Sequence, residues 1–104
     1  MIRGEVYWAE LSGDAGFRPV VIVSRDETLA RRQNVTVAEI TRTVRRLPSE
    51  VPLSTSNGMP AACVIHTDNI HTIPLDHIRK RITSLKGEAL FHLDQALRYS
   101  LGLD

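Results

Sequence analysis

Pro-Val-Val-Ile-Val, residues 19–23, is a continuous apolar run of strand length. Such a run is typical of a central strand covered on both faces, and Pro19 suits the residue at which that strand begins. Residues 35–41, VTVAEIT, follow a period of two and predict another strand. Alternation then places two sets of side chains on opposite sides of this strand: Val35, Val37, Glu39 and Thr41 on one, Thr36, Ala38 and Ile40 on the other.

Further strands are expected on either side of these two stretches. Residues 5–11 (EVYWAEL) mix aromatic and β-branched side chains with charged ones and predict the first strand, followed by a loop at SGDAG. Residues 49–54 predict a short strand at a sheet edge, because Pro52 cannot donate a ladder hydrogen bond. Residues 56–60 (SNGMP) predict a turn. Residues 61–67 and 69–73 predict two strands or one bent strand, and residues 79–85 a last strand.

Helical patterns are confined to three places. Residues 26–33 indicate a helical turn or a mobile excursion, and residues 74–78 one short helical turn. From Glu88 to Leu101 the period changes to three and four, which predicts a closing helix that ends at Gly102. Its apolar stripe comprises Leu90, Leu93, Leu97 and Leu101. The whole chain, residues 1–104, is therefore expected to be one mostly β domain, an SH3-like antiparallel β-barrel or half-barrel with a C-terminal helix.

Composition narrows the class of protein. The chain is 42% hydrophobic and 24% charged, which is ordinary for a globular domain. It has no apolar run long enough for a membrane span and no signal-peptide pattern, so a cytoplasmic protein is expected. The single cysteine, Cys63, lies in an apolar stretch and is expected to be a small buried side chain.

Charge distribution is more informative than the net charge of +1. Eleven of the thirteen basic residues are arginines, whose planar fork binds phosphates with two hydrogen bonds. Several are clustered, and residues 42–46 carry Arg42, Arg45 and Arg46. Phosphate contact and a solvated face are both open interpretations of this cluster.

Metal chemistry has little support in the sequence. His66 and His71 are five residues apart on extended chain and are expected to face opposite ways, while His77 and His92 lie elsewhere. His92 is expected to be exposed on the terminal helix. Neither a paired carboxylate motif nor a glycine-rich phosphate loop is present. A nuclease with this sequence is therefore expected to work without a metal ion or other cofactor.

Five segments in order resemble one family. They are RGEVYWAEL at residues 3–11, Arg18-Pro19 followed by VVIVSRD, the strand ending in Ile40-Thr41, the segment from Cys63 to Ile73 centred on DNIHTI, and the closing LDQALRYSLGL. Together they cover nearly the whole chain, and it is identified as a member of the MazF/PemK (Kid-like) toxin endoribonucleases of type II toxin–antitoxin systems. The resemblance implies the toxin fold shared by CcdB and PemK.

The resemblance also implies an activity, which is metal-independent cleavage of single-stranded RNA. A ribose 2′-hydroxyl attacks the neighbouring phosphorus, leaving a 2′,3′-cyclic phosphate and a 5′-hydroxyl end. The positions that match the family's cleavage residues are Arg18 and Thr41. Arg18 is a poor proton acceptor and suits a phosphate clamp, and Thr41 adds one hydroxyl hydrogen bond. Asp14, Glu39 and His71 are all open as acceptors of the 2′-proton.

Contacts to RNA and to protein partners follow from the same resemblance. Candidate RNA contacts, including stacking and base-edge bonds, are Asp14, Phe17, Arg25, Arg42, Arg45, Arg46, Asn69 and His71. His71 takes the place of a basic residue in the Asp-Gln-Ile-Arg-like run of relatives. The loop from Ser12 to Phe17 is shorter than in many relatives, so their sequence preference is not carried over. The family implies a homodimer and a cognate MazE-like antitoxin.

Two rival functions are kept open at this point. A CcdB-like toxin binds DNA gyrase without cleaving RNA, through a Trp-Gly-Ile tail. Here the tail is Leu-Gly-Leu-Asp and the one tryptophan is Trp8, which favours the nuclease. The other rival is a noncatalytic SH3-like RNA-binding module, which would keep the arginine clusters and have no use for Arg18 and Thr41 as a pair.

Overall fold

The computed structural model describes residues 1–11, 16–29 and 31–103. The loop expected at residues 12–16 and the candidate Asp14 fall largely or wholly outside the described residues. The elements are β1 (Glu5–Leu11), β2 (Gly16–Ile22), α1 (Asp26–Leu29), β3 (Asn34–Thr41), β4 (Glu50–Leu53), β5 (Cys63–Pro74), β6 (Ile78–Ser84) and α2 (Glu88–Leu101), with 3₁₀ turns η2 (Thr55–Asn57) and η3 (Leu75–His77). No described helix is long and apolar enough to cross a membrane.

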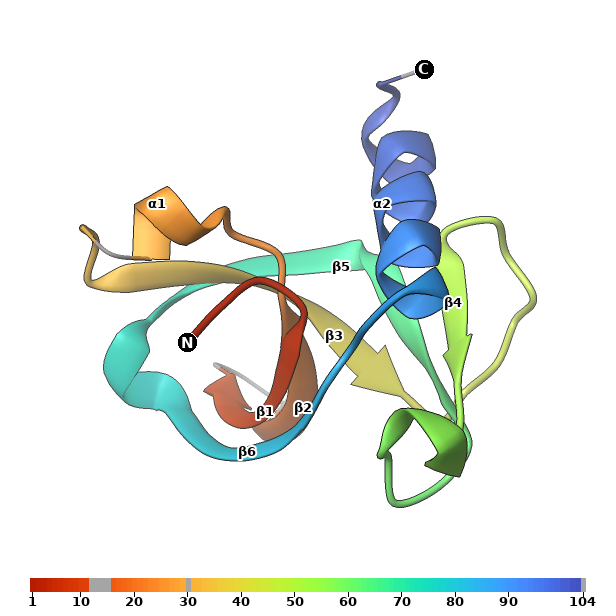
Figure 1. The fold of residues 1–104 in the computed structure, drawn as a ribbon, viewed down its shortest axis with the longest axis horizontal. Helices are drawn as coiled ribbons and strands as arrows, with labels where there is room; N and C mark the ends of the chain where they lie inside the picture. The colour runs from red at the N-terminus through yellow and green to blue at the C-terminus, as the bar shows by residue number, and fades with distance from the viewer. Residues whose placement is uncertain (12–15, 30, 104) are drawn as a thin grey trace.

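Six strands form one antiparallel sheet in the order β4-β5-β3-β2-β1-β6. The sheet curls strongly on itself as a half-barrel, and α2 packs against the part formed by β4 and β5 (Figure 1). The mostly β fold with a terminal helix is confirmed. β2 is an interior strand, and Val20, Val21 and Ile22 are fully buried, as the apolar run predicts. β4, which contains Pro52, lies at the edge.

The two faces of the sheet bury separate cores, which follow from strand alternation. The face toward α2, called the helix-side face, carries Val6, Val21, Ala38 and Ile40. The other face, called the opposite face, carries Val20, Ile22, Val35 and Val37. The division of β3 into two sets of side chains is therefore confirmed for its buried residues.

Details of two elements, β2 and α2, differ from the sequence prediction. β2 begins at Gly16, because its hairpin with β1 pairs three residues before Pro19, and the described pairs with β3 begin only at Val20. Leu93 is fully buried in α2 and Gly102 ends the helix, as predicted, but Leu101 is 56% exposed. Ala89 and Ala96 complete the buried stripe instead, since they lie nearer the sheet.

β5 is one strand with a bulge, which is the second of the two forms expected for residues 61–73. Ala38 of β3 pairs with Ile70, whereas the next residue, Glu39, pairs with His66. Residues 67–69 are therefore inserted into β5 between two consecutive pairs. An odd number of inserted residues reverses the alternation of side chains beyond the bulge.

Candidate functional site

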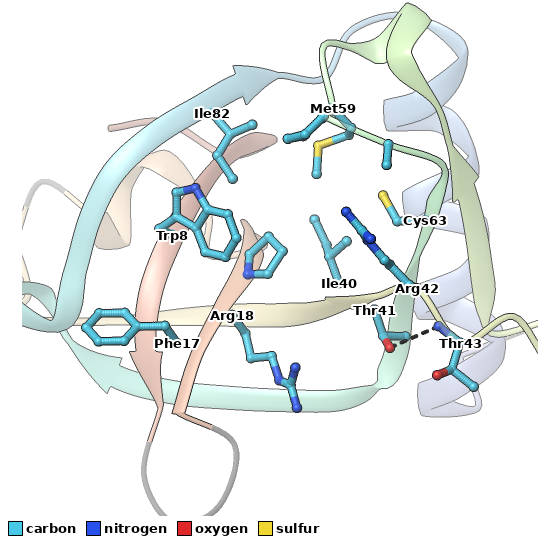
Figure 2. A pocket seen from close by; sticks show the side chains of 13 residues that line it. Trp8, Phe17, Arg18, Ile40, Thr41, Arg42, Thr43, Met59, Cys63 and Ile82 are labelled. Carbon is cyan, nitrogen blue, oxygen red and sulfur yellow. Dashed lines mark hydrogen bonds between the residues drawn. The ribbon is translucent and has the colours of Figure 1, made fainter.

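A cavity of about 570 Å³ opens where β2 begins and β3 ends. Continuing the unbroken β2–β3 register, in which Val20 pairs with Glu39, brings Arg18 opposite Thr41. Both side chains line the cavity, together with Phe17 and Arg42 (Figure 2). Residues that are 23 positions apart in the sequence therefore line one cavity, because β2 begins beside the end of β3.

The two faces of the sheet contribute different chemistry to this cavity. One wall of the cavity lies on the helix-side face and consists of Trp8, Ile40, Arg42, Met59, Cys63 and Ile82. Figure 2 shows the guanidinium of Arg18 and the hydroxyl of Thr41 leaving their strands on the other side. The described lining contains two arginines and no carboxylate. A cavity with this lining attracts an anion that carries an apolar or aromatic part.

The Thr41 hydroxyl is oriented by its own chain. The backbone amide of Thr43 donates a hydrogen bond to Thr41 Oγ1 at 3.2 Å. Because the oxygen is the acceptor in this bond, the hydroxyl hydrogen is available for donation to a ligand.

Cys63 is buried as predicted, and burial raises the pKa of its thiol, although the charge of Arg42 opposes the shift.

Glu39 and His71 form a second pair, which does not line the cavity but lies beside it. His71 Nε2 and Glu39 Oε2 are 2.6 Å apart, and both side chains are partly buried. Glu39 precedes Thr41 by two residues on β3, so alternation places both on the opposite face, about 7 Å apart along the strand. His71 pairs with Val37 and shares that face.

The bulge in β5 overturns one expectation about the histidines. His66 pairs with Glu39 and His71 with Val37, and residues directly opposite in a ladder share a face. The two histidines therefore lie on the same face, and the prediction that they face opposite ways is wrong because three inserted residues reverse the alternation. Among the described residues, no three His, Cys, Asp or Glu side chains are grouped as a metal site. His92 is exposed, as expected.

The remaining RNA-contact candidates lie away from the cavity. Arg25 is exposed and its Nε lies 3.6 Å from Glu27 Oε2. Arg45 and Arg46 are exposed in the segment between β3 and β4, and Asn69 is exposed in the β5 bulge. Of the eight candidates, only Phe17 and Arg42 line the described cavity.

Sequence reasoning overlooked Trp8, whose position on the helix-side face of β1 could have been derived from alternation with Val6.

Fold and cavity together define a small half-barrel domain with an arginine-lined cavity at its strand ends. The family model for PemK-like, MazF-like toxins of type II toxin–antitoxin systems matches residues 2–101. A probable endoribonuclease MazF2 of Mycobacterium tuberculosis is 43% identical over 103 residues, 98% of this chain and 99% of that protein. The chain therefore belongs to the PemK-like, MazF-like toxin family, as the sequence resemblance predicted.

Solved structures agree with this assignment. The Mycobacterium tuberculosis toxin MazF-mt6 superposes with a TM-score of 0.87 and 35% identity, over 96% of this chain and 98% of that one. An endoribonuclease from a mycobacterial species, solved in complex with its cognate antitoxin, gives a TM-score of 0.90 and 27% identity, over 100% of this chain and 97% of that one.

Proposed function

We propose that the chain is a sequence-selective endoribonuclease toxin that cleaves single-stranded RNA without a metal ion and thereby inhibits translation and growth. The observation that supports it best is the meeting of Arg18 and Thr41 at one basic cavity, in a chain similar over its whole length to named endoribonucleases. We expect it to act in the cytoplasm, where its RNA is found.

The reaction is an internal transesterification. A ribose 2′-oxygen attacks the adjacent phosphorus, the bond from phosphorus to the 5′-oxygen breaks, and a 2′,3′-cyclic phosphate and a 5′-hydroxyl result. One proton leaves the 2′-hydroxyl and one is delivered to the departing 5′-oxygen. Because the substrate supplies its own nucleophile, the protein has to align the two oxygens, neutralise the phosphorane and move protons.

Arg18 and Thr41 suit the second of these tasks. The guanidinium of Arg18 remains charged at any physiological pH and can hold two phosphate oxygens with its fork. The free hydroxyl hydrogen of Thr41 adds a donor to a phosphate oxygen, while the Thr43 amide holds its oxygen in place. A guanidinium N–H of Arg18 can also donate a hydrogen bond to the leaving 5′-oxygen.

The Glu39–His71 pair is our candidate for the proton acceptor. Of the three residues considered for this role, Asp14 lies outside the described residues, and the other two are joined by one short hydrogen bond beside Thr41. A carboxylate held by a histidine is a suitable general base, and the histidine fixes its orientation. More distant parts of the RNA strand would be contacted by the candidates outside the cavity, which are Arg25, Arg45, Arg46 and Asn69.

Two protein partners belong to the proposal. A cognate MazE-like antitoxin is expected to neutralise the toxin, since the mycobacterial relative of known structure was solved with its antitoxin. A homodimer is supported by exposed apolar side chains on and just after α2, which are Phe91, Tyr99, Leu101 and Leu103.

The test is cleavage of a mixed RNA pool in excess EDTA, with the new ends mapped by their 5′-hydroxyl groups. Arg18→Ala should lower the rate about 10²- to 10³-fold, the loss typical of one transition-state donor. Arg32→Gln removes the same charge from the exposed segment between α1 and β3 and should leave the rate unchanged. A substrate with deoxyribose at the cut should be stable.

Three results would overturn the proposal. Cleavage that survives both Arg18→Ala and the deoxyribose substrate would reject the mechanism. Binding of RNA with no cleavage would favour a noncatalytic RNA-binding module. Intact RNA together with inhibition of DNA gyrase would favour the gyrase-binding alternative.

A further inference from the structure

Trp8 presents its indole to the cavity on the side away from Arg18. It belongs to β1, pairs with Pro19 across the β1–β2 ladder and is 39% exposed. Figure 2 shows the ring on one wall, with Ile82 and Met59 along the side above it and Ile40 between Trp8 and the far wall. A large aromatic side chain left partly exposed inside a cavity offers a flat surface for stacking.

Arg42 closes the opposite wall. It follows Ile40 and Thr41 at the end of β3, and Figure 2 shows its guanidinium pointing into the cavity beside Cys63. The effect of the Arg42 charge on the Cys63 thiol agrees with this proximity. Figure 2 shows the indole nearly face-on, with its edge turned toward the guanidinium of Arg42. A base stacked on the indole would therefore present its own edge to the N–H donors of Arg42.

We infer that this space is a base-binding subsite, which takes the nucleobase next to the phosphate held by Arg18 and Thr41. Single-stranded RNA is recognised by bases that are turned out, stacked on aromatic side chains and hydrogen-bonded at their edges. Trp8 supplies the stacking surface and Arg42 the edge contact. The sheet separates the two tasks, since the base enters the helix-side part of the cavity and the phosphate stays at the strand ends.

The donor pattern of Arg42 selects guanine. An arginine fork has only donors, so it needs two neighbouring acceptors, and guanine offers O6 and N7 side by side. The corresponding edge of adenine has one acceptor and one donor. Uracil has two carbonyl oxygens separated by an N–H group. Cytosine offers two acceptors on a smaller ring, which stacks over less of the indole.

The inference rests on the proposed function, and its test separates the two. Pentamers with 2′-O-methyl groups lack the attacking hydroxyl, so they report binding without cleavage. One is all uracil, and three others carry guanine, adenine or cytosine at the centre. Because Trp8 is the single tryptophan of the sequence, its fluorescence reports the subsite directly. The guanine pentamer should quench it with a dissociation constant about tenfold lower than the other three, within the range of one bidentate base contact.

Variants identify the two walls. Arg42→Gln should abolish the preference for guanine, whereas Arg32→Gln, in the exposed segment between α1 and β3, should retain it. Labelled guanine pentamer, followed by anisotropy, should bind Trp8→Phe nearly as well as the unchanged protein and Trp8→Leu about tenfold more weakly, as expected for one stacked base. Circular dichroism melting checks that each variant is folded.

Equal quenching by the four pentamers, or a preference for a base other than guanine, would overturn the inference. So would a guanine preference that survives Arg42→Gln. If these results appear while RNA is still cleaved to 5′-hydroxyl ends in an Arg18-dependent way, the subsite is wrong and the nuclease proposal stands.

Discussion

The hydrogen bond between Glu39 and His71 is the residue-level feature with the most direct consequence for the chemistry. The bond is 2.6 Å long and joins a carboxylate to an imidazole, and both groups are partly buried beside the end of β3. A structural bond between strands would hold β3 to β5 and do nothing more. A catalytic pair would also accept the 2′-proton, so the two roles predict different losses on substitution.

Replacing the carboxylate distinguishes these roles. Glu39→Gln preserves the size and one acceptor of the side chain, but it removes the base, so kcat should fall about 10²-fold or more while KM changes little. Single-turnover cleavage measures this. The matched control is Thr36→Val, which breaks the 2.9 Å hydroxyl bond to Thr72 between the same two strands on the other face. Wild-type cleavage by Glu39→Gln would assign the proton acceptor elsewhere.

At the scale of elements, the basic segment between β3 and β4 is folded around one carboxylate. The backbone amides of Arg45, Arg46 and Leu47 all donate to the side chain of Glu50 at the start of β4, at 2.8–3.4 Å. Arg46 adopts φ +58°, in the left-handed region that arginine rarely occupies. Glu50 therefore offsets the cost of this conformation and fixes the direction of the arginine-rich segment.

The sign of the effect of Glu50→Ala on RNA binding is a sharp test of this arrangement. Simple electrostatics predicts tighter RNA binding when an acidic residue is removed. If Glu50 preorganises the arginine-rich segment, RNA binding should instead weaken about threefold to tenfold, because the segment of the variant must become ordered when the RNA binds. Anisotropy with a noncleavable RNA measures it, and Glu88→Ala, which removes an exposed charge from α2, is the control. Tighter binding by Glu50→Ala would contradict the prediction.

At the scale of the whole molecule, the β5 bulge is where the sheet and the terminal helix are joined. Asp68, in the bulge, accepts hydrogen bonds from the hydroxyls of Ser49 at 2.7 Å and Ser100 at 2.8 Å. The buried Thr67 hydroxyl donates to the carbonyl oxygen of Ser49 at 2.6 Å. These bonds connect β5, the segment before β4 and α2. The bond from Ser49, followed by that from Ser100, holds the pKa of the Asp68 carboxyl below its ordinary value.

This lowered pKa predicts the pH dependence of folding stability. A carboxyl with a lower pKa in the folded protein stabilises it above the unfolded pKa, about 3.9 for aspartate, and that contribution is lost as pH falls through the folded pKa. The free energy of unfolding of Asp68→Asn, measured in urea, should therefore be lower than wild type at pH 7, with the difference shrinking below about pH 4. Ser100→Ala should behave similarly but more weakly. A difference that is constant with pH would contradict this prediction.

Much of the fold followed from local patterns. The run at residues 19–23 correctly indicated an interior strand, Pro52 an edge strand and Gly102 the end of the helix. These features depend on properties of single residues and their near neighbours, which are the missing amide proton of proline, the left-handed backbone of glycine and the period of apolar side chains. Leu101 belongs to the predicted apolar stripe but is exposed, because helix periodicity does not show how far the sheet extends beneath the helix.

The sequence by itself determined the family, the strand and helix order, and Arg18 and Thr41 as the residues to examine. Only the tertiary structure decided that the two meet at one cavity, that Trp8 and Arg42 face each other across it, and that Glu39 is bonded to His71. The physical reason is register. Side-chain direction alternates reliably along an uninterrupted strand, but three residues inserted at 67–69 reverse it, and such an insertion becomes visible only when β5 is paired with β3.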